Sequence, residues 1–423
     1  MSLLIQKTHT APSNIACIKY WGKRDLKTNT PINSSVSVTM NQDDLKAITT
    51  VTASSLFEKD RLFLNGIEED LTNNKRVGAV LREIRARASS HLKNLYVTVV
   101  SRNTFPTAAG LASSAAGYAC LVSTLADVFE VKESYKGELS TIARMGSGSA
   151  CRSLYGGFVR WSMGSKLDGS DSLAIQIAPE NHWPELKLLI AVVSEKKKDT
   201  GSTDGMVRSV QTSELLKHRA MTVVPARLEA LETAYLKKDF DTFAKLTMQD
   251  SNQFHACCLD TYPPVFYMNE VSRRIITLVH KLNSTSGHIV AGYTFDAGPN
   301  AVIFCLEKNA AIILALLLSH FPLDESNTSS TVSSSSSSSS STTFSVSEAF
   351  IHLRTEAETN GTVEINKLGL TCNRDEQQTG LVRHIYYTSV GDGPRVLTLE
   401  ESLAFQDGLP KVTQVDGSVD KAL

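Results

Sequence analysis

The stretch FPTAAGLASSAAGYACLVSTLADVF, residues 105–129, decides how the rest of the chain is interpreted. A loop opens the stretch, and a helix rich in small residues follows and ends near Phe129. Backbone N–H groups at the start of a helix, together with the hydroxyls of Ser113 and Ser114, suit a phosphate group. Close packing of a small-residue helix inside a core explains the composition about equally well. No Gly-Lys-Ser/Thr follows, so the stretch is not a Walker A loop.

A second stretch with anion-binding character follows at Gly146-Ser-Gly-Ser-Ala-Cys-Arg152. Two glycines and two serines beside a helical segment suit an anion, and the planar guanidinium of Arg152 can hold a carboxylate or phosphate at two points. A turn between two helices that carries a surface arginine is the alternative interpretation.

Polar and aromatic residues also gather near an early strand, in Asn14-Ile-Ala-Cys-Ile-Lys-Tyr-Trp-Gly-Lys23. The two lysines suit polyphosphate and the two rings suit a nucleotide base, although such rings pack in or around a core equally often. Further along, Glu195-Lys-Lys-Lys-Asp-Thr-Gly-Ser-Thr203 suits a loop that closes on phosphates, whereas a solvated charge run is the commoner meaning of such a segment.

The stretch Thr294-Phe-Asp-Ala-Gly-Pro-Asn300 lies between two apolar segments. An aspartate at the end of a strand, beside Gly-Pro, is well placed in a cleft, where Asp296 can act as a general base or as an electrostatic partner. An Asx turn is the structural alternative, because the sequence Asp-x-Gly favours one.

The pattern of apolar residues indicates mixed α and β structure without the regular βαβ alternation of a doubly wound sheet. Strands are expected within residues 34–52, 61–65, 95–100, 156–163, 186–193, 289–295, 301–306 and 381–390, the last of which is taken as the final strand. Helices are expected within residues 74–93, 105–129, 138–155, 226–246, 265–283 and 310–320. The pattern at 226–246 is broken near Lys238-Asp239 and followed by a helical stretch that Pro263-Pro264 ends, and the pattern at 138–155 is interrupted by Gly146-Ser-Gly-Ser149. Nine consecutive serines lie within residues 325–343, a segment expected to be disordered because it buries too little apolar surface. The last twenty or so residues are expected to be a tail.

The composition excludes several classes of protein. Lys and Arg number 43 and Asp and Glu 44 among the 423 residues, so no bulk positive charge favours nucleic acid or an anionic membrane. The longest apolar run, Ala310 to Leu318, is too short to span a bilayer. Seven cysteines without a CxxC pair, and no signal-peptide segment in MSLLIQKTHTAPSN, indicate a cytoplasmic protein with reduced thiols.

Five stretches, in their order along the chain, resemble the diphosphomevalonate decarboxylase family of the GHMP kinase superfamily. They are Ala11-Pro-Ser-Asn-Ile-Ala with Lys19-Tyr-Trp-Gly-Lys-Arg24, Asn33-Ser-Ser35, Phe105-Pro-Thr-Ala-Ala-Gly-Leu-Ala-Ser-Ser-Ala-Ala116, Gly146-Ser-Gly-Ser-Ala-Cys-Arg152 and Asp296-Ala-Gly-Pro-Asn300. The resemblance runs from about Ala11 to about Pro322 and resumes weakly near Gly391 and Gly408. Other GHMP kinases share the general form of the phosphate loop, but not the Lys-Tyr-Trp-Gly-Lys or Asp-Ala-Gly-Pro-Asn stretches.

The resemblance implies an α+β GHMP kinase fold of two lobes. An N-terminal lobe like domain 2 of ribosomal protein S5 is expected over residues 1–188, and a ferredoxin-like C-terminal lobe over residues 189–423. A deep cleft between the lobes is expected to hold the active site. The Ser-rich segment falls in the C-terminal lobe, where members of the family vary. The family is commonly homodimeric, so a homodimer is expected, with no nucleic-acid or membrane partner.

The reaction implied by the resemblance has two steps and uses ATP as co-substrate and Mg²⁺ as cofactor. ATP phosphorylates the 3-hydroxyl of (R)-5-diphosphomevalonate (mevalonate diphosphate), and the new phosphate then leaves while the C1 carboxylate departs as CO₂. The products are isopentenyl diphosphate, ADP, phosphate and CO₂, in the mevalonate pathway of isoprenoid and sterol synthesis. A mevalonate-type 3-kinase without decarboxylation is one alternative, and Arg152 together with Asp296 argues against it. A non-catalytic GHMP-fold sensor is another, and the presence of Asp296 and the loop serines argues against it.

The resemblance also implies a role for individual residues. The implied catalytic residues are Asp296 at the 3-hydroxyl, Arg152 at the substrate carboxylate, and Asn14 and Lys19 beside the reacting groups. The implied substrate contacts are Tyr20, Trp21, Gly22, Lys23, Arg76, Ser147, Gly148, Ser149, Ala150, Cys151, Arg152 and Thr203. The implied ATP contacts are Ala108, Ala109, Gly110, Leu111, Ala112, Ser113 and Ser114, with Ser113 and Ser114 also the implied Mg²⁺ ligands. A lysine among residues 196–198 is expected to close on the ATP phosphates.

Overall fold

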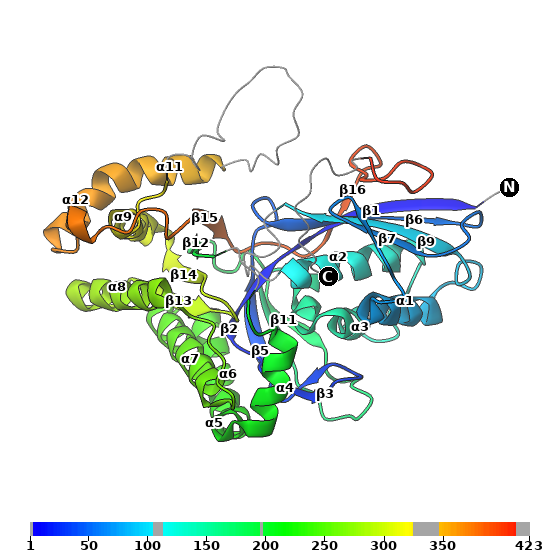
Figure 1. Cartoon of the computed structure of the whole chain (residues 1–423), viewed down its shortest axis with the longest axis horizontal. Coiled ribbons are helices and arrows are strands. Elements are labelled where there is room, and N and C mark those ends of the chain that lie inside the picture. The colour runs from blue at the N-terminus through cyan, green and yellow to red at the C-terminus, as the bar shows by residue number, and fades with distance from the viewer. Residues whose placement is uncertain (1–2, 105–112, 195–197, 325–346, 412–423) are drawn as a thin grey trace, which may run out of the picture.

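The computed structural model describes residues 3–104, 113–194, 198–324 and 347–411. Three main sheets and the helices that cover them build the molecule, with the N-terminal half on the right of Figure 1 and most of the C-terminal helices on the left. Among the described strands, only β7 and β9 pair in parallel. The expected mixture of α and β structure without βαβ alternation is therefore confirmed.

The first sheet has six strands in the order β16-β1-β6-β9-β7-β8. They span Leu4–Pro12 (β1), Lys46–Ser54 (β6), Arg61–Leu64 (β7), Ile67–Glu69 (β8), Tyr96–Asn103 (β9) and Arg395–Leu397 (β16). The β-branched residues of β6 and β9 favour this extended structure. β6 is buried from Ala47 to Ser54, because helix α2 packs on one face of the sheet and residues 402–405 contact the other.

Helices of the N-terminal half cover the first sheet. They are α1 (Lys75–Arg87), α2 (Ser113–Val128), α3 (Glu138–Gly146) and the 3₁₀ helix η1 (Gly148–Leu154). α2 is buried on nearly every side, and small residues permit this packing: a Cβ on Gly146 would lie 2.1 Å from the ring of Tyr118. The small-residue helix is therefore central, as its composition indicated, and the helical segment 138–155 is interrupted at Ser147 as expected.

Two four-stranded sheets complete the framework. The second sheet, in the order β11-β10-β5-β2, consists of Asn14–Ile18 (β2), Ser35–Thr39 (β5), Phe158–Trp161 (β10) and Ala174–Ala178 (β11). The third sheet, in the order β13-β14-β12-β15, consists of Leu186–Val192 (β12), Ala291–Phe295 (β13), Ala301–Leu306 (β14) and His384–Ser389 (β15). A short ribbon pairs Lys23–Asp25 (β3) with Thr30–Pro31 (β4).

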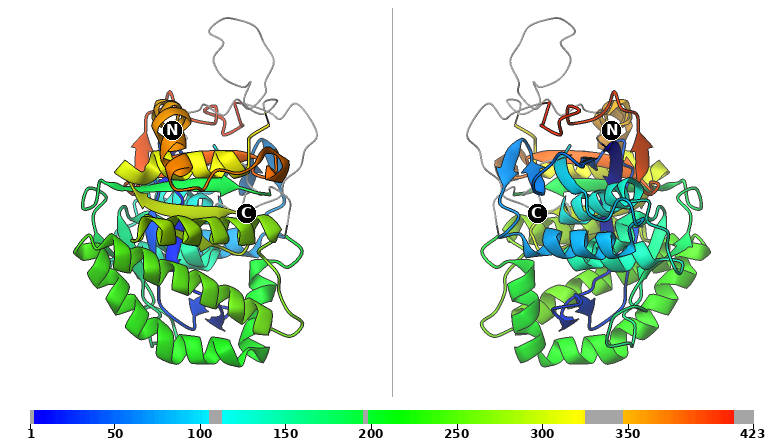
Figure 2. Two further views of the ribbon diagram at one scale, coloured as in Figure 1. Left: turned by 90° about the vertical axis from the view of Figure 1, so that its left-hand side faces the viewer. Right: turned by 90° about the vertical axis from the view of Figure 1, so that its right-hand side faces the viewer.

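Helices lie on both faces of the third sheet. Those of the C-terminal half are α4 (Ser202–Thr212), α5 (Glu214–His218), α6 (Val224–Leu236), α7 (Phe240–Asp260), α8 (Glu270–Ser286), α9 (Ala310–His320), α11 (Glu348–Glu356) and α12 (Thr362–Lys367). Shorter helical segments are η2 (Arg219–Val223), η3 (Glu307–Asn309), η4 (Ala357–Gly361) and η5 (Arg374–Glu376). α7 and α8 contact the sheet from one side and α9 and α11 from the other, as the views of Figure 2 also show.

The structure corrects three expectations from the sequence. Residues 381–390 are not the final strand, because β16 follows and pairs with β1, and three residues give too short an alternation to recognise. The expected tail is wrong in part, since Ala404 is buried and pairs with Pro410 against the first sheet. The helix expected from residue 265 begins only at Glu270, where the side chain of Asn269 caps it.

The Ser-rich segment 325–343 lies outside the described residues. Among the helices that the structure describes, we find none with the length and apolar character that a membrane crossing requires.

Candidate active site

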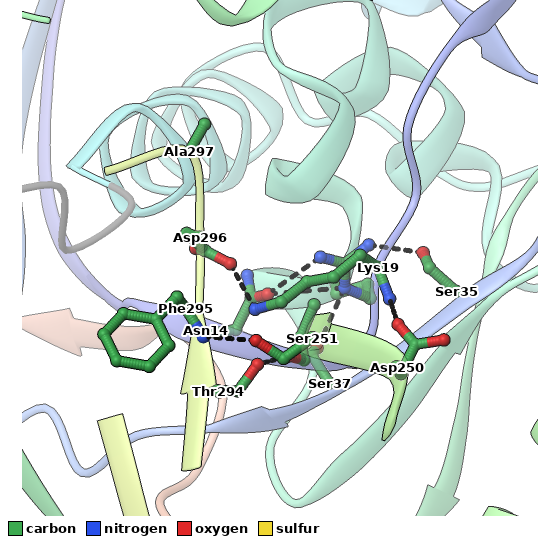
Figure 3. A network of polar contacts seen from close by, with 12 residues as sticks. Asn14, Lys19, Ser35, Ser37, Asp250, Ser251, Thr294, Phe295, Asp296 and Ala297 are labelled. Atoms are coloured by element: carbon green, nitrogen blue, oxygen red, sulfur yellow. Dashed lines mark hydrogen bonds and ion pairs between the residues drawn. The ribbon is translucent and has the colours of Figure 1, made fainter. Parts of the chain in front are cut away.

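An ion pair joins two of the motifs that lie far apart in the sequence. Lys19 directly follows β2 and Asp296 directly follows β13, and the ammonium of Lys19 donates to Oδ1 of Asp296 (Figure 3). The Lys19 side chain is 4% exposed, whereas that of Asp296 is 32% exposed. The pair therefore presents its carboxylate to a ligand and keeps its ammonium inside the protein.

Contacts on both sides of Asp296 hold its loop in place. The N–H of Phe295 donates to Oγ of Ser251 at 3.0 Å, and the N–H of Gly298 donates to the carbonyl oxygen of Asp296 at 2.7 Å. The side-chain oxygen of Asn300 accepts the N–H of Val193 at 2.7 Å, which ties the loop to the end of β12. The turn closes through the backbone carbonyl of Asp296 and not through its side chain, so it is not the Asx turn that the sequence offered as an alternative, and the carboxylate instead accepts from Lys19.

A buried histidine lies behind the ion pair. His255 in α7 is 3% exposed, and burial, followed by the charge of Lys19, lowers its pKa to about 3. Its Nε2 has no hydrogen-bond partner among the described residues. The imidazole is therefore neutral near pH 7 and adds no second positive charge beside Lys19.

Arg152 is buried among neutral hydrogen-bond acceptors. Its Nε donates to Oγ of Ser37 at 2.9 Å, its Nη1 to Oγ of Ser35 at 2.7 Å, and its Nη2 to Oδ1 of Asn14 at 3.2 Å. The residue is 2% exposed, forms no ion pair with any carboxylate of the described chain, and has its pKa lowered by burial. Because an uncompensated buried charge is costly, this arrangement favours an anionic ligand beside the guanidinium.

Asn14 is itself fixed by the segment that carries Arg152. Its amide nitrogen donates to the carbonyl oxygen of Ser149 at 3.0 Å and to Oγ of Ser153 at 2.7 Å. Its oxygen is therefore turned toward the guanidinium, so the surface-arginine interpretation of residues 146–152 is wrong.

A second positively charged group forms where the two halves of the chain meet. Nη2 of Arg76 in α1 donates to Oγ1 of Thr203 in α4 at 2.9 Å. Burial, with the nearby charge of Arg76, lowers the pKa of Lys23 to about 8. A lysine whose pKa is lowered partly by a neighbouring arginine gains from a multiply charged anion such as a diphosphate, which would offset the repulsion between the two cations.

Tyr20 lies against the segment of Gly148. Its ring meets that of Trp161 edge-on at 4.7 Å, and burial raises the pKa of Tyr20 to about 12. A Cβ on Gly148 would lie 2.6 Å from the Tyr20 hydroxyl, so the glycine permits this close approach. The phenol stays protonated near pH 7 and can donate a hydrogen bond.

Trp21 and Gly22 pack against buried residues behind the site. Trp21 is 2% exposed, and its indole N–H already donates to Oγ of Ser209 in α4 at 2.9 Å. Gly22 has φ +99°, and a Cβ there would come within 2.7 Å of Ile32 and Val210. These two residues therefore fix the course of the chain between Lys19 and Lys23.

The start of α2 faces the start of η1. The hydroxyls of Ser114 and Ser147 lie 3.2 Å apart, and Ser147 and Ser149 lie 3.5 Å apart. Ser113 is the first residue of α2. Residues 108–112 of the expected ATP loop lie outside the described residues.

Ala150 and Cys151 point into the core rather than toward a polar surface. Both are 0% exposed, the Cys151 thiol donates to the carbonyl oxygen of Gly148 at 3.0 Å, and burial raises its pKa to about 12. Neither side chain supplies a polar group to the site.

Lys198 lies next to the Asp296 loop. Its ammonium donates to Oγ of Ser202 at 2.9 Å and to the carbonyl oxygen of Ala297 at 3.0 Å, and burial lowers its pKa. Residues 195–197, with the other two lysines of the run, lie outside the described residues. A cation is therefore present beside the loop of Asp296, on the side of α4.

Sequence reasoning gave no role to Ser35, Ser37, Arg219 or Asp250. The two serines alternate along β5 and so face one side of it, a signal that the Ser-x-Ser pattern contains. Arg219 and Asp250 contact Lys19 across 200 and 231 residues, and no local spacing indicates such a contact.

Comparison with known proteins agrees with this geometry. Residues 11–174 match the model of the diphosphomevalonate decarboxylase-like N-terminal domain, and residues 188–397 match that of the mevalonate 5-diphosphate decarboxylase C-terminal domain. The diphosphomevalonate decarboxylase of Rattus norvegicus is 49% identical over 416 residues, which cover 96% of each chain.

Solved structures give the same result. The mevalonate diphosphate decarboxylase from Trypanosoma brucei superimposes with a TM-score of 0.80 at 34% identity, covering 94% of this chain and 100% of that one. A decarboxylase in complex with MVAPP, AMPPCP and magnesium superimposes with a TM-score of 0.68 at 28% identity, covering 93% and 99%. The expected α+β GHMP kinase fold is thereby confirmed. With family models that together cover most of its length and relatives nearly half identical to it, the chain belongs to the diphosphomevalonate decarboxylase family.

Proposed function

We propose that this chain catalyses the ATP-dependent decarboxylation of mevalonate diphosphate to isopentenyl diphosphate, with ADP, phosphate and CO₂ as the other products. The observation that carries the proposal is the buried guanidinium of Arg152, surrounded by neutral acceptors, beside the buried ammonium of Lys19 and the partly exposed carboxylate of Asp296. A site for this reaction needs a cation that binds the substrate carboxylate and a charged group beside the reacting hydroxyl, and Arg152 and Asp296 can supply them.

Arg152 is proposed to bind the C1 carboxylate of the substrate. Its hydrogen bonds to Ser35, Ser37 and Asn14 fix the plane of the guanidinium before the substrate arrives. A two-point grip on the carboxylate then fixes the C1–C2 bond that breaks, so the enzyme aligns it with the leaving group at C3.

Asp296 is proposed to face the 3-hydroxyl, held there by Lys19. In a loose phosphoryl transfer the hydroxyl proton leaves late, so positioning of the hydroxyl is as important as its deprotonation. Loss of the new phosphate develops positive charge at C3, and the negative charge of Asp296 lies where it can stabilise that charge. The electrons of the C1–C2 bond form the alkene as CO₂ departs.

The diphosphate of the substrate is proposed to lie at Lys23 and Arg76, with Thr203, Ser147 and Tyr20 as hydrogen-bond donors. The support is the pair of neighbouring cations at the junction of α1, α4 and β3. Trp21, Gly22, Gly148, Ala150 and Cys151 are proposed to shape this subsite through packing and backbone rather than through polar side chains.

ATP and Mg²⁺ are proposed to bind at residues 108–114 and at Lys198. Mg²⁺ keeps several waters and binds mainly through phosphate oxygens and one or two protein oxygens, which the hydroxyls of Ser113 and Ser114 can supply. The ion neutralises charge on the ATP phosphates when bound. Support comes from the solved relative described as a complex with AMPPCP and magnesium, and from the decarboxylase of Enterococcus faecalis described as having an ATP binding mechanism mediated by mevalonate diphosphate.

Several broader proposals accompany the reaction. We propose that the lobes divide near residue 188, which the family-model boundaries support. We also propose that the protein is a homodimer and acts in isoprenoid and sterol synthesis. We propose further that it acts in the cytoplasm, and its seven cysteines, which are all free and buried, support a reducing compartment. Light scattering tests the dimer.

One assay tests the proposed reaction. The chain is incubated with ATP, Mg²⁺ and carboxyl-labelled mevalonate diphosphate, and ADP and released CO₂ are followed together. We expect one CO₂ for each ADP. ADP without CO₂ would make the chain a 3-kinase, and the absence of both products would contradict the proposal.

A further inference from the structure

A buried pair of opposite charges lies behind Lys19. Arg219, the first residue of η2, donates from Nη1 and Nη2 to the two carboxylate oxygens of Asp250 in α7, at 2.7 and 2.8 Å. The side chains of both residues are 0% exposed. Two parallel hydrogen bonds fix the plane of such a pair, so it is a rigid unit.

This pair, which we term the Lys19 clamp, holds both polar groups of one backbone residue. Oδ2 of Asp250 accepts the Lys19 N–H at 2.8 Å (Figure 3), and Nη2 of Arg219 donates to the Lys19 carbonyl oxygen at 3.0 Å. The side chain of Asn33 donates to the same carbonyl oxygen at 3.1 Å. Helices of the C-terminal half thus fix the position of a residue of the N-terminal half.

A second arginine next to the clamp gives its surroundings an excess of positive charge. Nη1 of Arg227 donates to Oδ1 of Asp250 at 3.0 Å, and the side-chain oxygen of Gln253 accepts from both arginines. Two guanidinium groups therefore share one carboxylate. Removal of Asp250 would leave both of them unpaired in the interior, which makes Asp250 variants prone to misfold.

The Lys19 side chain connects the clamp to the reacting carboxylate. Its backbone is held by Arg219 and Asp250, and its ammonium is held by Asp296, so every one of these charged partners comes from the C-terminal half. We infer that the Lys19 clamp positions Lys19, and through it Asp296, for the reaction, an inference that rests on the proposed function. Arg219 and Asp250 are positioning residues, because their contacts are with Lys19. A displacement of about 1 Å at a reacting group can cost about 10²-fold in rate.

The molecule contains a matched control for this inference. Arg85 donates to the two carboxylate oxygens of Asp60 at 2.8 and 2.6 Å, Asp60 accepts the N–H of Val97 at 2.9 Å, and Arg85 donates to the carbonyl oxygen of Leu95 at 2.9 Å. We term this pair the β9 clamp. It makes the same kinds of contact to a strand that carries no residue of the site.

The test compares Arg219→Lys with Arg85→Lys. Lysine keeps the positive charge for the carboxylate but lacks the fork that reaches the backbone as well. We expect Arg219→Lys to lower kcat by about 10- to 100-fold while KM for mevalonate diphosphate stays within about threefold. We expect Arg85→Lys to keep kcat within about twofold although its Tm also falls. Equal losses of kcat in the two variants would overturn the inference.

A second variant guards against failure to fold. Arg227→Lys weakens the hold on Asp250 from the side away from Lys19, at a side chain that is 14% exposed. We expect it to lower kcat in the same direction by about two- to fivefold. A kcat equal to that of wild type, in a folded Arg227→Lys whose Tm has fallen, would count against the clamp.

A double-mutant cycle separates positioning from general destabilisation. In a Lys19→Met background the clamp has no ammonium left to position, so Arg219→Lys is expected to cause no further loss of kcat. Independent losses that multiply would overturn the inference.

A measurement independent of turnover separates this inference from the proposed function. Acetylation of Lys19 by a lysine reagent, followed by mass spectrometry, is expected to be faster in Arg219→Lys than in wild type and unchanged in Arg85→Lys. A wild-type chain that releases no CO₂ would contradict the proposed function alone. Unchanged labelling of Lys19 in a folded Arg219→Lys would overturn the clamp, whatever reaction the protein catalyses.

Discussion

The Lys19 clamp and the β9 clamp use nearly the same hydrogen bonds in two different regions of the molecule. Each pairs an arginine with both oxygens of an aspartate, and each pair also binds a backbone N–H and a backbone carbonyl. They differ in burial: the charged side chains are 0% exposed in the first, and 23% and 19% exposed in the second. They also differ in what they hold, since one grips a single lysine and the other the start of a strand.

The difference shows that function does not follow from the pattern of contacts alone. Val97, held by the β9 clamp, is buried in the hydrophobic core, so that clamp contributes to the fold. Lys19 extends an ammonium to Asp296, so the same contacts there set the position of a charge. The residue that is held, rather than the residues that hold it, decides whether a clamp serves the fold or the reaction.

The widest contrast is expected between removal of the acid that the Lys19 clamp positions, Asp296, and removal of the acid that belongs to the β9 clamp, Asp60. We expect Asp296→Asn to lower kcat by about 10³- to 10⁴-fold with little change in KM, because the amide keeps the shape but not the charge beside the reacting hydroxyl. We expect Asp60→Asn to keep kcat and to lower Tm. Steady-state CO₂ release and thermal unfolding measure both effects. A kcat of Asp296→Asn within about tenfold of wild type would remove the proposed role of Asp296.

A smaller but still large effect is expected at Arg152, which forms no ion pair with a carboxylate of the described chain. We expect Arg152→Lys to lower kcat by about 10²-fold, since one ammonium cannot make the planar two-point grip on a carboxylate. Arg160→Lys is the control, because Arg160 pairs with Glu232 at 3.1 Å and is not among the proposed site residues. Near-wild-type turnover of Arg152→Lys would mean that the carboxylate is aligned by other groups.

The pH dependence of kcat/KM should depend on Lys23 and not on the arginines of the two clamps. With a pKa of about 8, Lys23 is charged below this pH and loses its charge above it. We therefore expect kcat/KM for mevalonate diphosphate to fall as the pH rises through about 8, and Lys23→Arg to move this fall to higher pH. Arg85→Lys should share the wild-type profile. The same alkaline fall in Lys23→Arg as in wild type would assign it to another group.

The smallest effect is expected from the Ser-rich segment. Deletion of residues 325–343 should leave kcat, KM and Tm close to those of wild type, because its nine consecutive serines offer little apolar surface for packing. Replacement by a Gly-Ser linker of equal length serves as the control for chain length. A tenfold loss of kcat on deletion alone would show that the segment has a role that its composition does not indicate.

Several helices and motif residues were predictable from the sequence because they depend on interactions between residues that are close together in the chain. The helix expected within residues 74–93 is α1, and Val77, Val80, Leu81 and Ile84, which are spaced along one helical face in the sequence, are all buried. The helix expected at Ala310 to His320 is α9 with the same bounds. The motifs also identified Lys19, Asp296, Arg152 and Asn14 as separate candidates, and the structure pairs Lys19 with Asp296 and Arg152 with Asn14.

Contacts that depend on tertiary structure were not predictable from one sequence. Asp250 sits within a helical pattern and carries no sign that it meets Lys19 from 231 residues away. β16 has three residues, too few for an alternating pattern, and its existence depends on the open edge of β1. Lys19 was expected near the reacting groups, but its ion pair with Asp296 is known only from the structure, because the two residues are far apart in the sequence.

The pairing of β16 with β1 has a consequence for synthesis on the ribosome. Val396 lies opposite His9, so the strand that closes the edge of the first sheet is translated almost 400 residues after the strand that it covers. At a translation rate of about 5–20 residues per second, the edge of β1 stays uncovered for tens of seconds. An exposed strand edge is a template for wrong pairing, so the nascent chain is most prone to associate with other chains during this interval.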